Sequence, residues 1–206
     1  MSAHAEIKTD RGVETRRHIL DVAARVFAEK GYAGASFSAL IEASGLTKGA
    51  FYFHFPSKEA LALAAFGHTQ EKWVSAVLAA TDGSAPAADQ LEAMLEAAVH
   101  FHETEPAARC VARLCFELGE ASSLRPQLVP YLTTWEEMVT ALIRGAQDEG
   151  DYRPDFDAMA AARVSVAAFI GISDVSQVVS EGQDLRRRAE EFRDVFVRGM
   201  RRGARE

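Results

Sequence analysis

The chain has 206 residues, of which 48% are apolar and 26% charged, with six Pro and fourteen Gly. This composition is typical of a soluble globular protein of one or two domains and excludes disordered and fibrous chains. The net charge of −7 argues against a protein that coats nucleic acid through a general positive field.

The acidity is unevenly spread along the chain. Residues 1–70 have a net charge of +1, and the remainder has a net charge of −8. Such an asymmetry is expected where one segment meets a polyanion and the other does not, although chance can also produce it.

Four helices are expected in the first eighty residues, because apolar side chains recur at spacings of three and four. They span about 15–30, 36–44, 48–54 and 58–80. Gly31 ends the first helix, and Ser36, Thr47 and Ser57 are N-caps of the next three. Pro56 prevents the third helix from continuing.

The rest of the chain is also predicted to be helical, with short breaks between long apolar-striped segments. The helices are expected over about 88–103, 106–119, 126–149, 155–180 and 185–201. No segment alternates apolar and polar residues as a strand does, so the sequence predicts an all-α fold.

Membrane, export and metal signals are missing from the sequence. The longest apolar run is ten residues, Val164 to Ser173, against the ~20 of a spanning helix. The N-terminus has no apolar stretch of a signal peptide, so we expect a cytoplasmic protein with no membrane partner. Cys110 and Cys115 lie five apart on one predicted helix, about 8 Å between Cα atoms, so we expect free buried thiols and no disulfide, metal or cofactor.

The second and third helices form a helix-turn-helix pattern, joined by the tight turn Ser44-Gly45-Leu46. In this pattern the third helix can enter a DNA major groove. Gly49 and Ala50 are small enough to let the backbone approach base edges and a thymine methyl group, and Lys48 can donate to a guanine edge or a phosphate.

The flanks of the third helix provide further phosphate donors. Tyr52 and His54 are expected on the outside, where they can donate to phosphates. Lys58 and the exposed amides at the start of the fourth helix make a second phosphate site. The alternative is an aromatic core, which we expect for Phe51 and Phe55 and which remains open for Tyr52 and His54.

The run from Leu46 to Leu61 resembles the DNA-binding domain of TetR-family transcriptional regulators, as do Ile19 to Ala24 and Phe27 to Tyr32 in the first helix. The resemblance implies a TetR-type helix-turn-helix DNA-binding domain over 13–73 and a helical ligand-binding and dimerisation domain over 74–206. The DNA contacts that it implies are Ser36, Ser38, Thr47, Lys48, Gly49, Ala50, Tyr52, His54 and Lys58.

A second resemblance is to the γ-butyrolactone autoregulator receptors, a subgroup of that family. It lies in Phe169 to Ser176, in Asp184-Leu185 with Arg188, in Thr47 to Ala50 and in Trp135. The sequence departs from the subgroup at Ser173 and Asp174, where larger polar residues are usual. The resemblance implies a small-molecule effector of the γ-butyrolactone type.

The same resemblance places Trp135 in the wall of the effector pocket, where a flat apolar ring packs on the ligand. A core Trp that fills space between helices is the equal alternative. Other large side chains can line the same cavity, although each also suits a plain core: Trp73, Met94, Phe101, Leu114, Phe116 and Phe169.

A homodimer is expected because one recognition helix alone makes a short and weak contact with DNA, whereas a two-fold dimer doubles it. Two apolar stripes are the natural halves of a four-helix interface. They are Phe169, Ile172, Val175 and Val179 on one helix, and Leu185, Ala189, Phe192 and Phe196 on the next. The alternative, partly required in any case, is that the stripes serve the core of the single chain.

The sequence therefore predicts a repressor that binds a palindromic operator as a dimer and leaves it when a small ligand binds. A helical enzyme that uses His100, His102, Glu103 and Glu105 is disfavoured, since residues i and i+2 of a helix point to different sides. A protein-interaction adaptor that uses Phe192 and Phe196 remains open, as does a TetR-type regulator of another ligand or of none.

Overall fold

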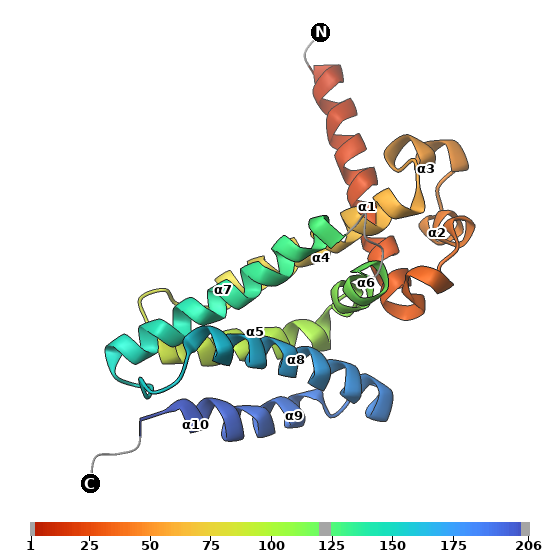
Figure 1. The fold of residues 1–206 in the computed structure, drawn as a ribbon. Coiled ribbons are helices and arrows are strands. Elements are labelled where there is room, and N and C mark those ends of the chain that lie inside the picture. Colours follow the sequence, from red (N-terminus) through yellow and green to blue (C-terminus); the bar gives the residue numbers. More distant parts are fainter. Residues whose placement is uncertain (1–2, 120–124, 203–206) are drawn as a thin grey trace. The chain divides into compact units, whose positions relative to one another are not determined.

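The computed structural model describes residues 3–119 and 125–202, and within these ranges it is helical, with an isolated bridge between Tyr152 and Arg201 (Figure 1). The all-α fold expected from the sequence is confirmed. The chain divides into two compact units. The N-terminal unit comprises Met1–Lys72 and Pro106–Leu128, and the C-terminal unit comprises Trp73–Glu105 and Val129–Glu206.

The N-terminal unit contains α1 (Ala3–Gly34), α2 (Phe37–Ser44), α3 (Lys48–His54), the first part of α4 (Lys58–Ala80) and α6 (Cys110–Gly119). The expected caps are present. Ser36 Oγ accepts the Ala39 amide at 3.1 Å, and Thr47 Oγ1 accepts the Ala50 amide at 3.3 Å. Gly45, at φ 66°, ends α2 in the left-handed conformation.

The core of the N-terminal unit is aromatic and aliphatic. Phe27 of α1 is fully buried, and Phe51 in the middle of α3 and Phe55 just after its end are only 1% and 2% exposed. Leu114 and Leu118 of α6 complete the same cluster. Each buried Phe stabilises the unit by about 1.5–3 kcal/mol, so α3 is held by its two aromatic anchors.

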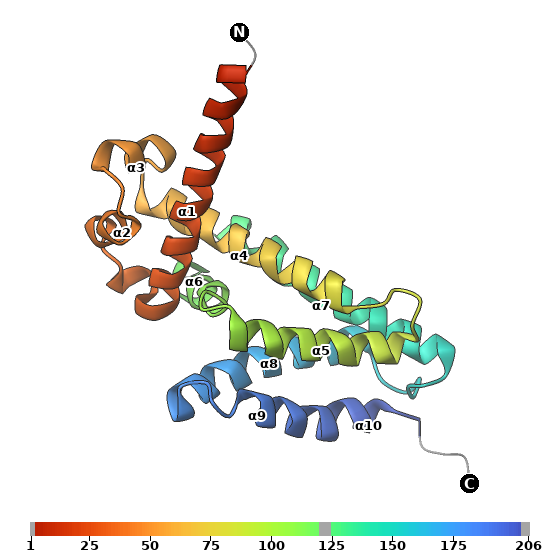
Figure 2. The same cartoon turned by 180° about the vertical axis from the view of Figure 1, so that it is seen from behind.

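Helix α6 packs against α1, where both views of the fold show it (Figure 2). Arg113 Nη1 donates to the carbonyls of Ala28 and Glu29 at 2.9 and 2.7 Å, and Glu117 accepts the Ala33 amide at 2.9 Å. These side chains satisfy backbone groups where α1 bends and ends. Residues 106–128 therefore pack with the N-terminal unit, although the predicted boundaries, 13–73 and 74–206, place them in the second domain.

Gly31 breaks α1, as the sequence predicted. Its φ of 71° lies in the left-handed region and its ψ of 176° is non-helical, so the helix is interrupted at this kink and only a short turn follows, to Gly34. The bond from Arg113 to the Glu29 carbonyl and the bond from the Ala33 amide to Glu117 lie on either side of the kink.

The C-terminal unit contains the rest of α4 together with α5 (Ala87–Thr104), most of α7 (Arg125–Glu149), α8 (Ala158–Ser180), α9 (Leu185–Phe192), η1 (Arg193–Val197) and α10 (Arg198–Met200). The single helix expected over 185–201 is thus interrupted by the π-helical turn η1. Arg186 of α9 ties this segment to α5 through ion pairs with Glu96 and Glu103 at 2.5 and 2.7 Å.

The turn from α8 to α9 is organised around Asp184. Its carboxylate accepts hydrogen bonds from Ser176 and Ser180 and pairs with Arg188, and these interactions hold the pKa of Asp184 well below its usual range. Asp157 caps the other end of α8 by accepting the Ala160 amide at 2.7 Å. Both ends of α8 are therefore fixed by carboxylates.

Helix α8 has 23 residues and a mean hydropathy of 1.5 in its most apolar window, so by length and composition it could cross a membrane. The uninterrupted apolar run within it is still the ten residues counted from the sequence, between Arg163 and Asp174, and the longer apolar window includes charged residues. A core helix of a soluble protein passes the same test, and α8 buries Ala162, Val166 and Phe169 in its own unit.

Candidate functional site

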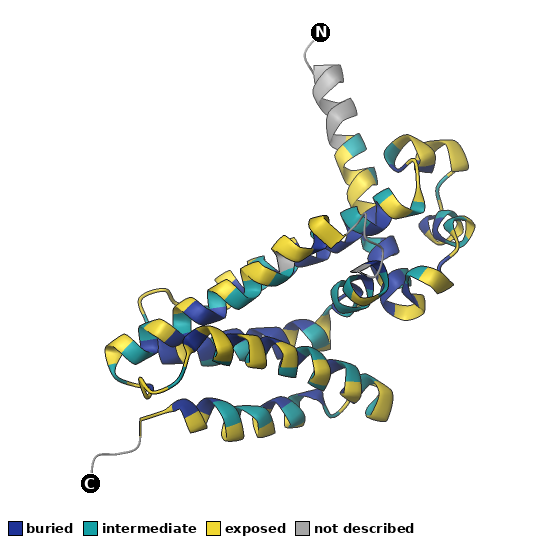
Figure 3. Cartoon of the chain, viewed as in Figure 1, coloured by how far each residue is buried: buried dark blue, intermediate teal, exposed yellow. Residues whose placement is uncertain are grey.

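The outer side of α3 is exposed (Figure 3). Phe51 and Phe55 point into the core, while Lys48, Gly49 and Ala50 are exposed. Successive residues of a helix are about 100° apart, so Gly49 and Ala50 lie on the side away from the core. All three residues expected to face bases are thus exposed, with Gly49 opposite the core and Lys48 and Ala50 on its two flanks.

Tyr52 is 43% exposed, and its ring is held in place from both sides. Phe37 of α2 packs edge-on against it at 5.2 Å between ring centroids, and Lys48 Nζ lies 5.8 Å from the ring centroid. Tyr52 therefore belongs to the outer surface and not to the core, as one of the two alternatives from the sequence predicted. His54 is half-buried at the end of α3.

Lys58 lies at the first position of α4, with its Nζ 4.2 Å from the centroid of the Tyr32 ring. Ser38 is exposed on α2, in the same unit. Ser36 and Thr47 are already used as helix caps, so their hydroxyl oxygens have a structural task in addition to the DNA contact that the resemblance implies.

Arg16 of α1 has a role that its place in the sequence does not reveal. Its guanidinium lies 4.4 Å from the centroid of the Phe55 ring, and Nη1 donates to the His54 carbonyl at 3.4 Å. A cation at this place is attracted to the negative, C-terminal end of the α3 dipole and stabilises it. Arg16 therefore fixes the C-terminal end of α3 from α1.

A second link joins α1 to α4 inside the N-terminal unit. Asp21 of α1 accepts hydrogen bonds from His68 Nε2 at 2.9 Å and Lys72 Nζ at 2.7 Å, both on α4. Partial burial alone would raise the pKa of Asp21, but the bonds from Lys72 and His68 outweigh it and hold this pKa below its usual value. The carboxylate thus stays ionised between the two helices.

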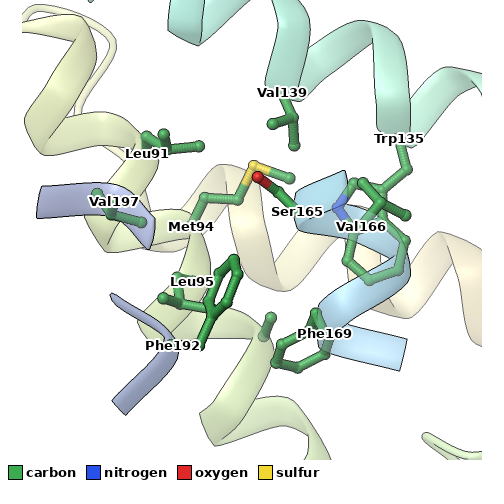
Figure 4. A pocket seen from close by; sticks show the side chains of 11 residues that line it. Leu91, Met94, Leu95, Trp135, Val139, Ser165, Val166, Phe169, Phe192 and Val197 are labelled. Atoms are coloured by element: carbon green, nitrogen blue, oxygen red, sulfur yellow. The ribbon is translucent and has the colours of Figure 1, made fainter. Parts of the chain in front are cut away.

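The C-terminal unit contains a small, partly open apolar cavity of about 50 Å³ (Figure 4). Side chains of α5, α7 and α8 and of the α9–η1 segment line it. They are Leu91, Met94, Leu95, Ala98, Trp135, Val139, Ser165, Val166, Phe169, Phe192 and Val197. A single water needs at least ~10–15 Å³, so a ligand larger than a few waters requires these side chains to move apart.

An aromatic row continues from the cavity wall. Trp135 packs against Trp73 at 4.4 Å and against Phe169 at 6.0 Å between ring centroids, and His102 meets Phe169 at 5.1 Å. The indole N–H of Trp73 is buried and has no hydrogen-bond partner. A buried donor left unpaired costs about 1–3 kcal/mol, so this position favours an acceptor.

The family of the chain follows from comparison with known proteins. A model of the bacterial regulatory proteins of the tetR family matches residues 19–65, and a model of the tetracyclin repressor-like C-terminal domain matches residues 89–201. The second match alone covers more than half of the chain. The chain belongs to the TetR family. Regulators of this family are DNA-binding proteins without enzymatic activity.

Three relatives that match this TetR-family regulator over most of its length are between 25% and 32% identical to it. The A-factor receptor protein of Streptomyces griseus is 32% identical over 182 residues, which cover 87% of this chain and 61% of that protein. TylP, a TetR regulator from Streptomyces fradiae, superposes with a TM-score of 0.72 at 30% identity, covering 94% of this chain and 90% of that one. A γ-butyrolactone receptor described as ArpA-like superposes with a TM-score of 0.76 at 25% identity, covering 94% and 92%.

The residues expected around an effector separate into three groups. Trp135, Phe169 and Met94 line the cavity, whereas Trp73 stands behind Trp135 and the buried Phe101 is not part of the lining. Leu114 and Phe116 are not part of the lining and lie on α6 of the N-terminal unit. There Leu114 is a core residue and Phe116 is 62% exposed.

The residues expected at a dimer interface also separate by burial. Leu185, Ala189 and Phe169 are 3–4% exposed within their own chain, so they are core residues with no surface left for a partner. Phe192 lines the cavity and stacks on Phe196 at 5.2 Å. The remaining candidates are Ile172 and Phe196, which are half-buried, and Val175 and Val179, which are 47% and 64% exposed.

The polar cluster on α5 that suggested an enzyme is dispersed. His100 is exposed, and His102 is hydrogen-bonded to the Ala98 carbonyl and packed on Phe169. Glu103 holds Arg186. Within the described ranges no group of three or more His, Cys, Asp or Glu side chains is placed to hold a metal ion. Burial raises the pKa of both thiols, Cys110 and Cys115, to about 12.

Proposed function

We propose that this TetR-family protein is a cytoplasmic repressor that binds a palindromic operator as a homodimer and is released by a small apolar effector of the γ-butyrolactone type. The observation that supports DNA recognition most directly is the exposed outer side of α3, with Gly49 and Ala50 away from the core and Lys48 and Tyr52 beside them. The contacts with DNA assigned to Ser36, Ser38, Thr47, His54 and Lys58 are part of this proposal.

A row of exposed small and apolar residues on α8 supports the dimer. Its members recur at spacings of three and four and are Ala160, Val164, Ala167, Gly171, Val175 and Val178. Val178 is 86% exposed, which leaves almost its whole side chain available to a partner. A two-fold axis would set the same surface of a second copy against it, and the dimer would present two α3 helices to the two halves of a palindrome.

The cavity beside Trp135 supports the effector. Its lining is almost entirely apolar, with the Ser165 side chain as a polar group, and this suits an apolar effector with a small polar part. Since the cavity holds only about 50 Å³, the effector would bind a more open arrangement of Met94, Trp135 and Phe192. Binding to that arrangement, with a differential of ~1–3 kcal/mol, is enough to shift the DNA-binding equilibrium.

Band-shift titration of the purified protein tests this proposal. We expect a retarded band with a fragment of its own promoter in moderate salt, one dimer per palindrome, and loss of the band on addition of a long-chain γ-butyrolactone. Failure to retard any fragment would contradict the operator, whereas a band unaffected by every lactone would contradict only the effector class.

A further inference from the structure

Phe53 is the exposed residue that neither the core nor the phosphate contacts explain. Its side chain is 85% exposed, and among the large hydrophobic side chains described only Val178 is more exposed. In the sequence it lies within the aromatic run from Phe51 to Phe55, two residues of which are core residues. On α3 it follows Gly49 by four residues and Ala50 by three, so all three share the side of the helix away from the core.

The surroundings of Phe53 form a small apolar surface bordered by polar groups. A Cβ placed on Gly49 would meet no atom within 4 Å, so the helix surface before Phe53 is open. The His54 ring packs edge-on against the Phe53 ring at 5.2 Å on one flank. Lys48 and Tyr52 lie on the other flank.

This arrangement matters for a helix that enters a major groove. The flanking cation and hydroxyl can reach phosphates, which position the protein without selecting a sequence. The side opposite the core meets the base edges, and there Phe53 can neither donate nor accept a hydrogen bond. In the major groove thymine alone presents a methyl group, at C5, and apolar side chains including Phe contact it.

We propose that Phe53 is a specificity-determining residue that recognises a thymine in each operator half-site through the C5 methyl group. The inference rests on the proposed operator binding by α3 and adds to it the identity of one base. Gly49 and Ala50 allow the backbone to come close, and Phe53, one turn further along, covers the methyl group. This contact stabilises the complex because it buries apolar surface of the Phe53 ring and of the thymine methyl group.

Replacing thymine by deoxyuridine tests this directly, because deoxyuridine keeps the hydrogen-bonding edge and lacks only the methyl group. The probe is a duplex that the full-length protein selects from a random library, resynthesised with deoxyuridine at one symmetric pair of positions at a time. Losing one buried methyl group weakens binding about fourfold, and losing it in both half-sites weakens it about fifteenfold.

The variant Phe53→Ala completes a double-mutant cycle. We expect it to bind the thymine duplex about fifteenfold or more weakly than the wild type and to lose the discrimination against deoxyuridine at the one sensitive pair. Because Phe53 contacts no phosphate, the dependence of its affinity on salt should match the wild type. Phe53 is exposed, so circular dichroism should show an unchanged fold.

Tyr52→Phe is the matched control, since it removes a hydroxyl from the neighbouring aromatic residue. It should weaken binding to both duplexes equally and keep the deoxyuridine effect. The proposal is overturned if no thymine position is sensitive, if Phe53→Ala keeps the wild-type ratio of affinities, or if it changes the salt dependence. If the library yields no bound duplex, the proposed operator binding fails as well, which is a separate and recognisable outcome.

Discussion

Val178 offers a sharp test of the proposed dimer, because it lies 86% exposed on the outer row of α8 and makes almost no contribution to its own unit. Val178→Ala removes two methyl groups. At ~0.8 kcal/mol for each buried carbon, scaled by the exposed fraction, the change removes about 1.4 kcal/mol per copy. A two-fold interface contains the residue twice, so we expect a loss of about 3 kcal/mol, or a rise of about 100-fold in the dimer dissociation constant.

The assay is sedimentation velocity of fluorescently labelled protein across a range of concentrations that spans dissociation. Alanine is a better helix former than valine, but this preference acts equally on monomer and dimer and cancels from the dissociation constant. Leu78→Ala is the control, because Leu78 is 64% exposed on α4 and lies outside the proposed interface. It should leave the dissociation constant unchanged.

Two results would refute the reasoning. One is a wild-type protein that sediments as a monomer at micromolar concentration. The other is a Val178→Ala dimer whose dissociation constant stays within about threefold of the wild type, since two buried valines cannot be removed from an interface at so small a cost.

Three further predictions concern the cavity, the bend of α1 and the carboxylate between α1 and α4. Ala98→Leu fills the cavity of about 50 Å³, so band shifts should show normal operator binding with release by the effector lost; normal release would place the effector elsewhere. Gly31→Ala gives a Cβ to a residue in the left-handed region and places it against the Glu117 carboxylate, so the free energy of unfolding measured in urea should fall by about 1–3 kcal/mol. Gly12→Ala, in open space on α1, is the control and should be neutral or stabilising. The pKa of Asp21 is lowered by folding, so its contribution is complete above the unfolded value of 3.8 and is lost as the pH falls through the folded value. Asp21→Asn should therefore destabilise the protein at pH 7 and flatten the loss of stability between about pH 4 and 2; an unchanged acid slope would show that Asp21 is not responsible.

The elements around α3 were predictable because each has a local signal. Thr47 caps α3, Pro56 prevents its continuation, and the two aromatic residues on its inner side fit the spacing of a helix. The helix starts and ends where these residues place it. Local chemistry of this kind depends on a few neighbours in the sequence, so a single chain contains all the information.

The features that the sequence did not reveal depend on contacts between distant residues. Arg113 and Glu117 bond to the end of α1 across more than eighty positions, and no spacing rule announces such a pair. The stripe from Leu185 to Phe196 is periodic whether it faces a partner or its own core, so periodicity alone could not assign Leu185 and Ala189. Burial against particular neighbours decides between these possibilities.

The insertion of α6 into the N-terminal unit has a consequence for building chimeric regulators. A fragment cut after residue 72 would lose Leu114 and Leu118 from its core and the side chains that satisfy the carbonyls at the bend of α1. The N-terminal unit, which contains the helix-turn-helix, is therefore made of two separate stretches of the sequence. A sensor made by exchanging heads between relatives should transplant residues 106–128 together with the first seventy-two, since a single crossover would pair each α1 with a foreign α6.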